Sequence, residues 1–219
     1  MVKRMDPDPI RRPVGLETIP IEWSRDSDGD LMDRVQRGDD RALELLIQRW
    51  SGRLAGFFQR LTGDDSDTDD LLQEAFLRVH RARASWKPGG SFSAWVHTIA
   101  RRLAMDRSRT RARKPLHRAS DTGGAPGHTT TLLGKIPDNA PTPFTAVSRL
   151  ELLVKLEEAL RAVPEIYREA VVLCDLQHLS YEEAAQVLDI PAKTVSSRLA
   201  RGRDCLREAL AAYRSGPIS

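Results

Sequence analysis

The stretch LSYEEAAQVLDIPAKTVSSRLARGRDCLREAL, residues 179–210, decides how the C-terminal part of the chain folds. Ser180 followed by Glu183 fits a capping box, in which each side chain accepts a hydrogen bond from a free amide at a helix start. The segment DIPA, residues 189–192, interrupts the helical pattern and predicts a tight turn. A second helix then carries apolar residues on one face, at Val195, Leu199, Leu206 and Leu210. Two helices around a tight turn indicate a helix-turn-helix.

The second helix of this pair carries side chains suited to DNA. In a helix-turn-helix the second helix enters the major groove, where arginine can donate two parallel hydrogen bonds to guanine and short hydroxyl side chains allow close approach. The predicted contacts are Lys193, Thr194, Ser196, Ser197, Arg198, Arg201 and Arg203. The alternative is a bundle helix with a charged outer face. Because helix-turn-helix elements serve many proteins, this stretch alone does not select a function.

The chain as a whole divides into two helical domains. Residues 147–214 form the domain of the helix-turn-helix, in which Pro164 separates two further helices. Residues 29–114 carry apolar side chains three or four apart and predict a compact domain of four helices. Residues 115–146, rich in Pro, Gly, Ser and Thr, are predicted to be a flexible linker, and residues 1–28 a disordered arm. The predicted fold class is therefore all-α.

Charge is distributed unevenly in this chain of 219 residues, although its net charge is only +3. Residues 101–118 are rich in arginine, whereas residues 64–70 are acidic. A run of charge is usually a solvated surface, but a basic run at one end of an amphipathic helix favours phosphate binding. The chain lacks an apolar run long enough to span a bilayer and a signal-peptide core, so a cytoplasmic protein is expected.

The two cysteines, Cys174 and Cys205, do not suggest a disulfide framework. Cys174 and His178 are four residues apart and could face one way on a helix, as a metal pair does. No second pair with zinc-finger spacing accompanies them, which favours a small buried thiol. No metal or cofactor is therefore expected.

Two motifs in the N-terminal domain carry a family resemblance. DTDDLLQEAFLRVHRARASW, residues 67–86, followed by SFSAWVHTIARRLAMDRSR, residues 91–109, resembles region two of bacterial sigma factors of the extracytoplasmic-function group. Residues 180–206 resemble their region four, and the order of the two domains matches. The resemblance implies a protein that binds core RNA polymerase and directs it to promoters, held inactive by an anti-sigma factor until a stress or envelope signal arrives.

The resemblance also implies roles for particular residues. The polymerase-binding helix would present Asp69, Asp70, Leu72, Gln73 and Glu74. The minus-ten element would be bound by aromatic side chains, which stack on single-stranded bases, and by arginines, which hold the backbone. The candidates are Trp86, Phe92, Trp95, Arg101, Arg102, Arg107 and Arg109. Phe92 and Trp95 also fit a place in the core, and the spacing of Trp95 from Ile99 favours the core.

At two positions the chain departs from the family pattern. Arg102 stands where many relatives have asparagine, and Ser196 stands where many carry arginine. The bases that each element selects therefore do not follow from the resemblance. The resemblance implies that the helix-turn-helix binds the minus-thirty-five element while the N-terminal domain binds the minus-ten element.

The length of the linker constrains the free protein. Promoter elements about 25 base pairs apart are separated by about 85 Å. The linker spans roughly 30 Å on average, although it reaches about 100 Å when fully extended. We therefore expect the free protein to hold its domains closer than a promoter requires, to bind promoters weakly, and to suit an inhibitor that clamps both domains.

Two other classes of function are alternatives to a sigma factor. A stand-alone helix-turn-helix regulator would need a ligand pocket, a phospho-acceptor domain or a dimerisation helix, and the N-terminal half shows none of these recognisably. A nuclease would need metal ligands, but the acidic segment GDDSDTDD, residues 63–70, lacks the spacing of an EF-hand and has no companion cluster. We therefore expect no enzymatic activity and no catalytic residues.

Overall fold

The computed structural model describes residues 26–63, 66–113 and 143–214, with side chains at residues 26–63, 66–111 and 152–211. Every regular element in these ranges is helical, which confirms the predicted all-α class. The first group contains α1 (Asp28–Gln36), α2 (Asp40–Thr62), α3 (Thr68–Arg81), the 3-10 helix η2 (Arg83–Ser85) and α4 (Phe92–Arg113). The second contains α5 (Pro143–Ala162), α6 (Glu165–Val171), the π-helical segment η4 (Val172–Leu176), α7 (Tyr181–Leu188) and α8 (Ala192–Arg214).

The domain boundaries differ slightly from those expected. Ser27, expected in the disordered arm, is the N-cap of α1 and forms a capping box with Asp30. Helix α5 begins at Pro143, inside the expected linker of residues 115–146. Proline is well tolerated in the first turn of a helix, where its missing N–H has no partner to lose. The remainder of the arm and nearly all of the linker lie outside the described residues.

Local signals end and begin the helices where the sequence indicates. Gly38, at φ 93°, separates α1 from α2, and Asp39 caps α2 by accepting a hydrogen bond from the Arg41 amide at 3.2 Å. The predicted capping box of Ser180 and Glu183 is present at the start of α7. Asp189, at φ 55°, ends α7 in the left-handed conformation and makes the tight turn into α8.

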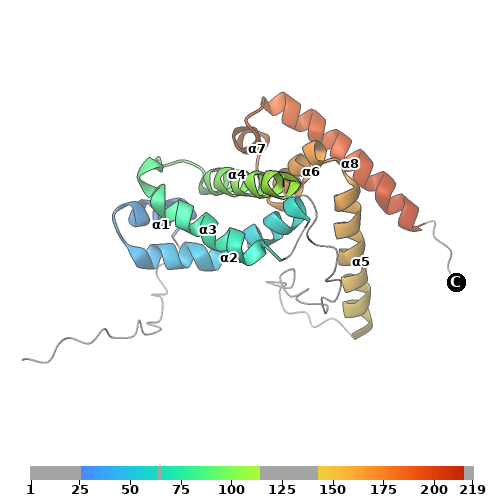
Figure 1. Cartoon of the computed structure of the whole chain (residues 1–219), viewed down its shortest axis with the longest axis horizontal. Helices are drawn as coiled ribbons and strands as arrows, with labels where there is room; N and C mark the ends of the chain where they lie inside the picture. The colour runs from blue at the N-terminus through green and yellow to red at the C-terminus, as the bar shows by residue number, and fades with distance from the viewer. Residues whose placement is uncertain (1–25, 64–65, 114–142, 215–219) are drawn as a thin grey trace, which may run out of the picture.

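The two groups of helices share an apolar core. Trp50, Leu54 and Phe57 of α2 are almost fully buried in the first domain. The second domain contributes Ala184, Val187 and Leu188 of α7 to the same buried cluster. Figure 1 shows α7 lying beside α4 and α6 close to the end of α4, while α8 extends away from the first domain. The two domains are therefore in direct contact.

The crossing of α6 and α8 depends on Gly202, which is buried. A Cβ atom at this position would lie 2.6 Å from Val171 Cγ2 and 2.9 Å from the backbone oxygen of Tyr167. We expect Gly202→Ala to lower the free energy of unfolding by about 1–3 kcal/mol, as overpacking does. Gly52→Ala is the matched control: a Cβ there meets nothing within 4 Å, and alanine should add about 0.5–1 kcal/mol in a helix. Chemical denaturation followed by helical circular dichroism measures both. Equal stability of the two variants would contradict the crossing argument.

Candidate nucleic-acid interface and docking groove

Helix α3 presents the residues expected to bind polymerase. Asp69, Asp70 and Gln73 are exposed, whereas Leu72 is half-buried. Glu74 accepts a hydrogen bond from Arg78 Nε at 2.8 Å, and this bond lowers the pKa of the Glu74 carboxyl. The helix begins with its acidic residues, which the partial positive charge of a helix N-terminus stabilises. The outer face of α3 is therefore acidic at its N-terminal end, at Asp69 and Asp70. One turn later the charge of Glu74 is neutralised by Arg78 of the same helix.

An apolar groove borders this acidic face. Its volume is about 590 Å³, and it is lined from α2 and α3 by Leu43, Ile47, Ser51, Leu72, Gln73, Phe76, Leu77 and His80. Of the expected polymerase contacts, Leu72 and Gln73 lie in this groove. Leu77 was missed by the sequence analysis, although 49% of it is exposed. The signal was available, since Leu77 is apolar but lies off the buried face of α3, which holds Leu71, Ala75 and Val79.

The aromatic candidates for base stacking form a cluster. Trp86 and Phe92 are 4% and 3% exposed, and Trp95 is half-buried. The Trp86 ring lies 5.7 Å from that of Trp95, and its Nε1 donates to Asp33 Oδ1 at 2.6 Å. In this arrangement Trp86 and Phe92 have no face open to a base. Trp95 is partly buried and packs against the same apolar core.

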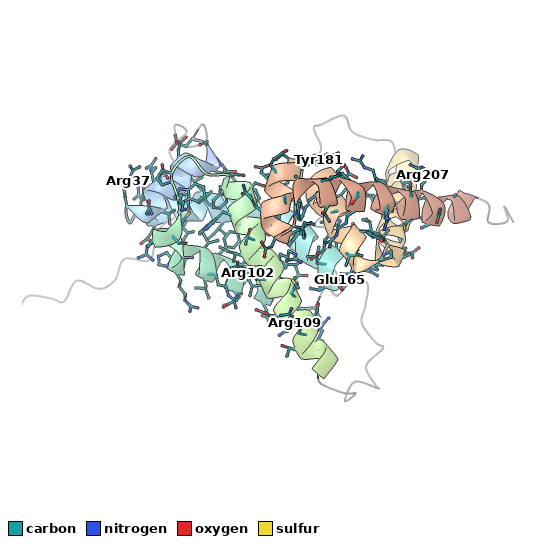
Figure 2. The ribbon with its side chains drawn as sticks, turned by 90° about the horizontal axis from the view of Figure 1, so that it is seen from above. Arg37, Arg102, Arg109, Glu165, Tyr181 and Arg207 are labelled. Atoms are coloured by element: carbon teal, nitrogen blue, oxygen red, sulfur yellow. The ribbon has the colours of Figure 1, made fainter. Side chains whose placement is uncertain are left out.

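The arginine side chains of α4 that the structure describes fall into three groups. Arg102 and Arg109 are exposed, and both are labelled along α4 in Figure 2. Arg107 donates to Asp67, and Arg111 Nη2 lies 2.5 Å from Asp67 Oδ2. Asp67 is buried, so its carboxylate holds both guanidinium groups in place. Arg101 turns instead toward the second domain, where it meets Glu169.

The residues expected to contact DNA from α8 are not equivalent. Lys193, Ser196 and Ser197 are exposed near the start of the helix, and Thr194 and Arg198 are half-buried. Val195 and Leu199 are buried, as the apolar pattern indicated. Further along, Arg201 Nη1 donates to the Tyr167 hydroxyl at 3.2 Å.

Arg203 is held by an acid of its own domain. Its Nε and Nη2 atoms donate to the two carboxylate oxygens of Asp175 at 2.9 and 2.5 Å, which raises the pKa of the guanidinium above its usual value. Two of the three expected arginine contacts therefore have partners within the second domain. Arg198 has no side-chain hydrogen bond among the described residues.

Cys174 and His178, the pair weighed as metal ligands, differ in their surroundings. Cys174 is half-buried, and burial raises the pKa of its thiol to about 11. His178 is exposed and has a positive φ of 60°. Among the described residues there is no group of three or more His, Cys, Asp or Glu side chains that could hold a metal ion. No described helix combines the length and apolar character that crossing a membrane requires.

Comparison with known proteins agrees with this two-domain arrangement. The family model Sigma-70 region 2 matches residues 46–114, and the model Sigma-70, region 4 matches residues 153–206. The ECF RNA polymerase sigma factor SigE of Mycolicibacterium smegmatis is 34% identical over 81% of this chain and 66% of its own length. The RNA polymerase sigma-H factor of Pseudomonas aeruginosa is 30% identical over 85% of this chain and 95% of its own.

Solved structures show the same fold. CnrH, in complex with the cytosolic domain of CnrY, aligns with a TM-score of 0.62 at 25% identity, over 85% of this chain and 99% of that one. The sigma factor RpoE of Bartonella quintana, in complex with the anti-sigma factor NepR, aligns with a TM-score of 0.56 at 21% identity, over 78% of this chain and 96% of that one. A region 2 domain followed by a region 4 domain defines a protein of the sigma-70 class. Within that class, the chain belongs to the extracytoplasmic-function (ECF) RNA polymerase sigma factors. Sigma factors are transcription initiation factors and not enzymes, as the sequence analysis expected.

Proposed function

We propose that this sigma factor docks on core RNA polymerase through α3 and the adjoining groove, and places α4 on the minus-ten element and α8 on the minus-thirty-five element. The groove carries the first part of the proposal, because an apolar channel beside Asp69 and Asp70 suits an amphipathic helix with basic residues at its edge. The exposed Arg102 and Arg109 support the second part. Such a protein acts where the polymerase is, in the cytoplasm.

Run-off transcription from a promoter library with reconstituted holoenzyme tests this function. We expect core polymerase to start at a defined subset of promoters only when this chain is added. A stand-alone regulator would change the output of a holoenzyme that already contains another sigma factor, but would confer no initiation on the core enzyme. That result would overturn the proposal. The selected templates would also reveal which bases are read.

Docking on polymerase should depend on the polar edge of the groove. Replacing Asp70 by lysine together with Gln73→Ala is expected to weaken binding to core polymerase about tenfold or more, since it sets a positive charge against a basic partner surface. Both side chains are exposed and belong to one face of α3, so the fold should be unaffected. Affinity is measured by pull-down of purified core enzyme over a concentration series.

The matched control places the same chemical change on another helix. Glu182→Lys with Gln186→Ala alters an exposed acid and an exposed amide of α7. This variant should bind core polymerase with the affinity of the unaltered chain. If both double variants bind equally well, the groove is not the docking site.

An anti-sigma protein is the second proposed partner. The structural neighbours include a sigma factor crystallised with its anti-sigma factor, and the two domains of this chain are already in contact. A protein that spans both domains would keep α4 and α8 too close together to reach both promoter elements at once. Added to the run-off assay, such a protein should abolish initiation that depends on this chain and leave initiation by other holoenzymes unchanged.

A further inference from the structure

Carboxylates of the second domain meet cationic or polar groups of the first at three places. Arg101 of α4 donates from Nε to Glu169 Oε1 at 2.7 Å and from Nη2 to Glu169 Oε2 at 3.2 Å. Arg60 of α2 donates from Nε and Nη2 to Glu157 Oε1 at 3.0 and 2.7 Å. Ser91, at the start of α4, donates its hydroxyl hydrogen to Glu183. The interface is therefore complementary in charge as well as apolar.

The pair of Arg101 and Glu169 is distinguished by its burial. Only 18% of the Arg101 side chain and 7% of the Glu169 side chain are exposed, compared with 41% and 38% for the pair of Arg78 and Glu74 on α3. An exposed pair contributes little to stability. A buried pair is different, because removal of one partner leaves an uncompensated charge in a place with little water. Because Arg101 and Glu169 belong to different domains, this ion pair exists only while the two domains are in contact.

The geometry of the pair resembles that of an arginine on a phosphate. A guanidinium binds a carboxylate and a phosphate with the same fork of two parallel N–H donors. Arg101 lies on α4 next to Arg102, and the exposed Arg109 lies further along the same helix. A DNA backbone that follows the basic side of α4 would reach Arg101 only after Glu169 had left it.

A second contact covers the beginning of α4. Glu183 accepts from the Ser180 amide at 2.8 Å within its own capping box and also accepts from Ser91, so one carboxylate joins α7 to α4. The Ser91 hydroxyl bond lowers the pKa of Glu183, which keeps this group charged. Figure 1 shows α7 lying beside α4. The closed arrangement thus covers the N-terminal part of α4 and occupies one of its arginines.

We propose that Glu169 takes the place of a DNA phosphate on Arg101, so that the second domain competes with minus-ten DNA for α4 until the domains separate. The inference rests on the proposed function, since it assigns the competing surface to promoter binding. Arg101 can then bind either Glu169 or a DNA phosphate, but not both at once. Contact between the domains therefore weakens DNA binding, and DNA binding weakens the contact between the domains by the same factor. Glu169 acts as a positioning residue of the closed state and contacts no DNA itself.

The test compares the free chain and variants in two measurements. Small-angle X-ray scattering reports the radius of gyration, and fluorescence anisotropy at low salt reports binding to a random-sequence single-stranded DNA of about 20 nucleotides, which contacts arginines without base readout. Glu169→Gln should enlarge the radius of gyration and raise the affinity for this DNA about tenfold, within the usual range of coupling between sites. Glu182→Gln makes the same chemical change at an exposed residue of α7 and should alter neither quantity.

Two further variants keep the test decisive. Glu157→Gln breaks the pair with Arg60 and leaves Arg101 and Glu169 intact, so it should open the chain and raise DNA affinity even if Glu169→Gln fails to fold. The exchange Arg101→Glu with Glu169→Arg restores the pair in reverse and should return the radius of gyration to its original value. Circular dichroism checks the helical content of each protein.

The proposal is overturned if folded Glu169→Gln and Glu157→Gln bind the DNA no better than the unaltered chain, or if the charge exchange stays expanded. These outcomes are independent of the run-off assay. If the chain initiates transcription but the variants show no gain in DNA affinity, the proposed function stands and the competition between Glu169 and DNA for Arg101 is ruled out. A chain that fails to initiate but opens and gains DNA affinity with these variants loses the proposed function and keeps only the competition between Glu169 and DNA phosphates for Arg101.

Discussion

Replacing Arg198 by alanine is expected to reduce initiation at promoters that have a minus-thirty-five element about 10- to 100-fold, the cost of one lost bidentate contact with a base. Arg198 lies one turn beyond Thr194 on α8, and its guanidinium makes no hydrogen bond among the described residues. An arginine without an internal partner can turn to DNA without first breaking an ion pair. The sequence alone predicted Arg198, Arg201 and Arg203 without ranking them, and we propose Arg198 as the first to test because Arg201 and Arg203 are hydrogen-bonded within the second domain.

The matched comparison is Arg203→Ala. Arg203 donates two hydrogen bonds to the carboxylate of Asp175. Its loss should therefore mainly lower the stability of the second domain, and should weaken DNA binding less than the loss of Arg198 does. Arg207, which is exposed and pairs with Asp204 of its own helix, is the control for general loss of positive charge. Run-off transcription is compared on two templates that differ only in the minus-thirty-five element. If Arg198→Ala retains the full preference for the intact template, the reader of that element lies elsewhere on α8.

The features predictable from the sequence were those with a local cause. The capping box of Ser180 and Glu183 depends on residues three positions apart, and the burial of Val195 and Leu199 follows from helical spacing. Periodicity likewise placed the long helices of both domains. Short-range patterns of this kind survive tertiary packing, because the neighbours that create them stay neighbours in the fold.

The contacts between the domains had no such signal. Glu169 lies near the end of α6 and is far in sequence from Arg101, so nothing nearby marks it as a buried acid. Asp67 appeared as one member of a solvated acidic run, yet it is buried and holds Arg107 and Arg111. Long-range ion pairs depend on how the helices pack, and a single sequence does not encode that in any local pattern. The burial of Trp86, which was expected to meet DNA, has the same origin, because its N–H is satisfied by Asp33 of α1.

Acidification from pH 7 to pH 5 is expected to lower the free energy of unfolding of the first domain by about 2 kcal/mol through His97 alone. His97 is fully buried on α4, between the rings of Trp50 and Phe57, and burial lowers the pKa of its imidazole from 6.5 to about 4. Nδ1 lies 2.8 Å from the Ser93 carbonyl oxygen, so this nitrogen carries the proton of the neutral ring. An added proton would have to go to Nε2, which is buried and has no hydrogen-bond partner among the described residues.

The sign follows from the two pKa values. Above about pH 6.5 the imidazole is neutral in both states, and its contribution to stability is complete. As the pH falls from 6.5 toward 4, the unfolded chain binds a proton that the folded chain refuses, and stability is lost. Arg53 of α2, Gln177 before α7 and Glu183 of α7 also face the ring. Arg53 further lowers the pKa of His97, whereas Gln177 and Glu183 oppose that shift without reversing it.

Urea denaturation followed by tryptophan fluorescence reports on the first domain, because three of the four tryptophans, Trp50, Trp86 and Trp95, belong to it. His97→Phe is the control. It keeps an aromatic ring against Trp50 and Phe57, places carbon where the unpartnered Nε2 was, and cannot bind a proton. The variant should lose much less stability than the unaltered chain between pH 7 and pH 5. Glu183, the carboxylate that faces the ring, has a lowered pKa and stays charged in this window. Identical pH slopes for the two proteins would show that the acid sensitivity of the domain comes from other groups, and that the imidazole of His97 is protonated as readily in the folded chain as in the unfolded one.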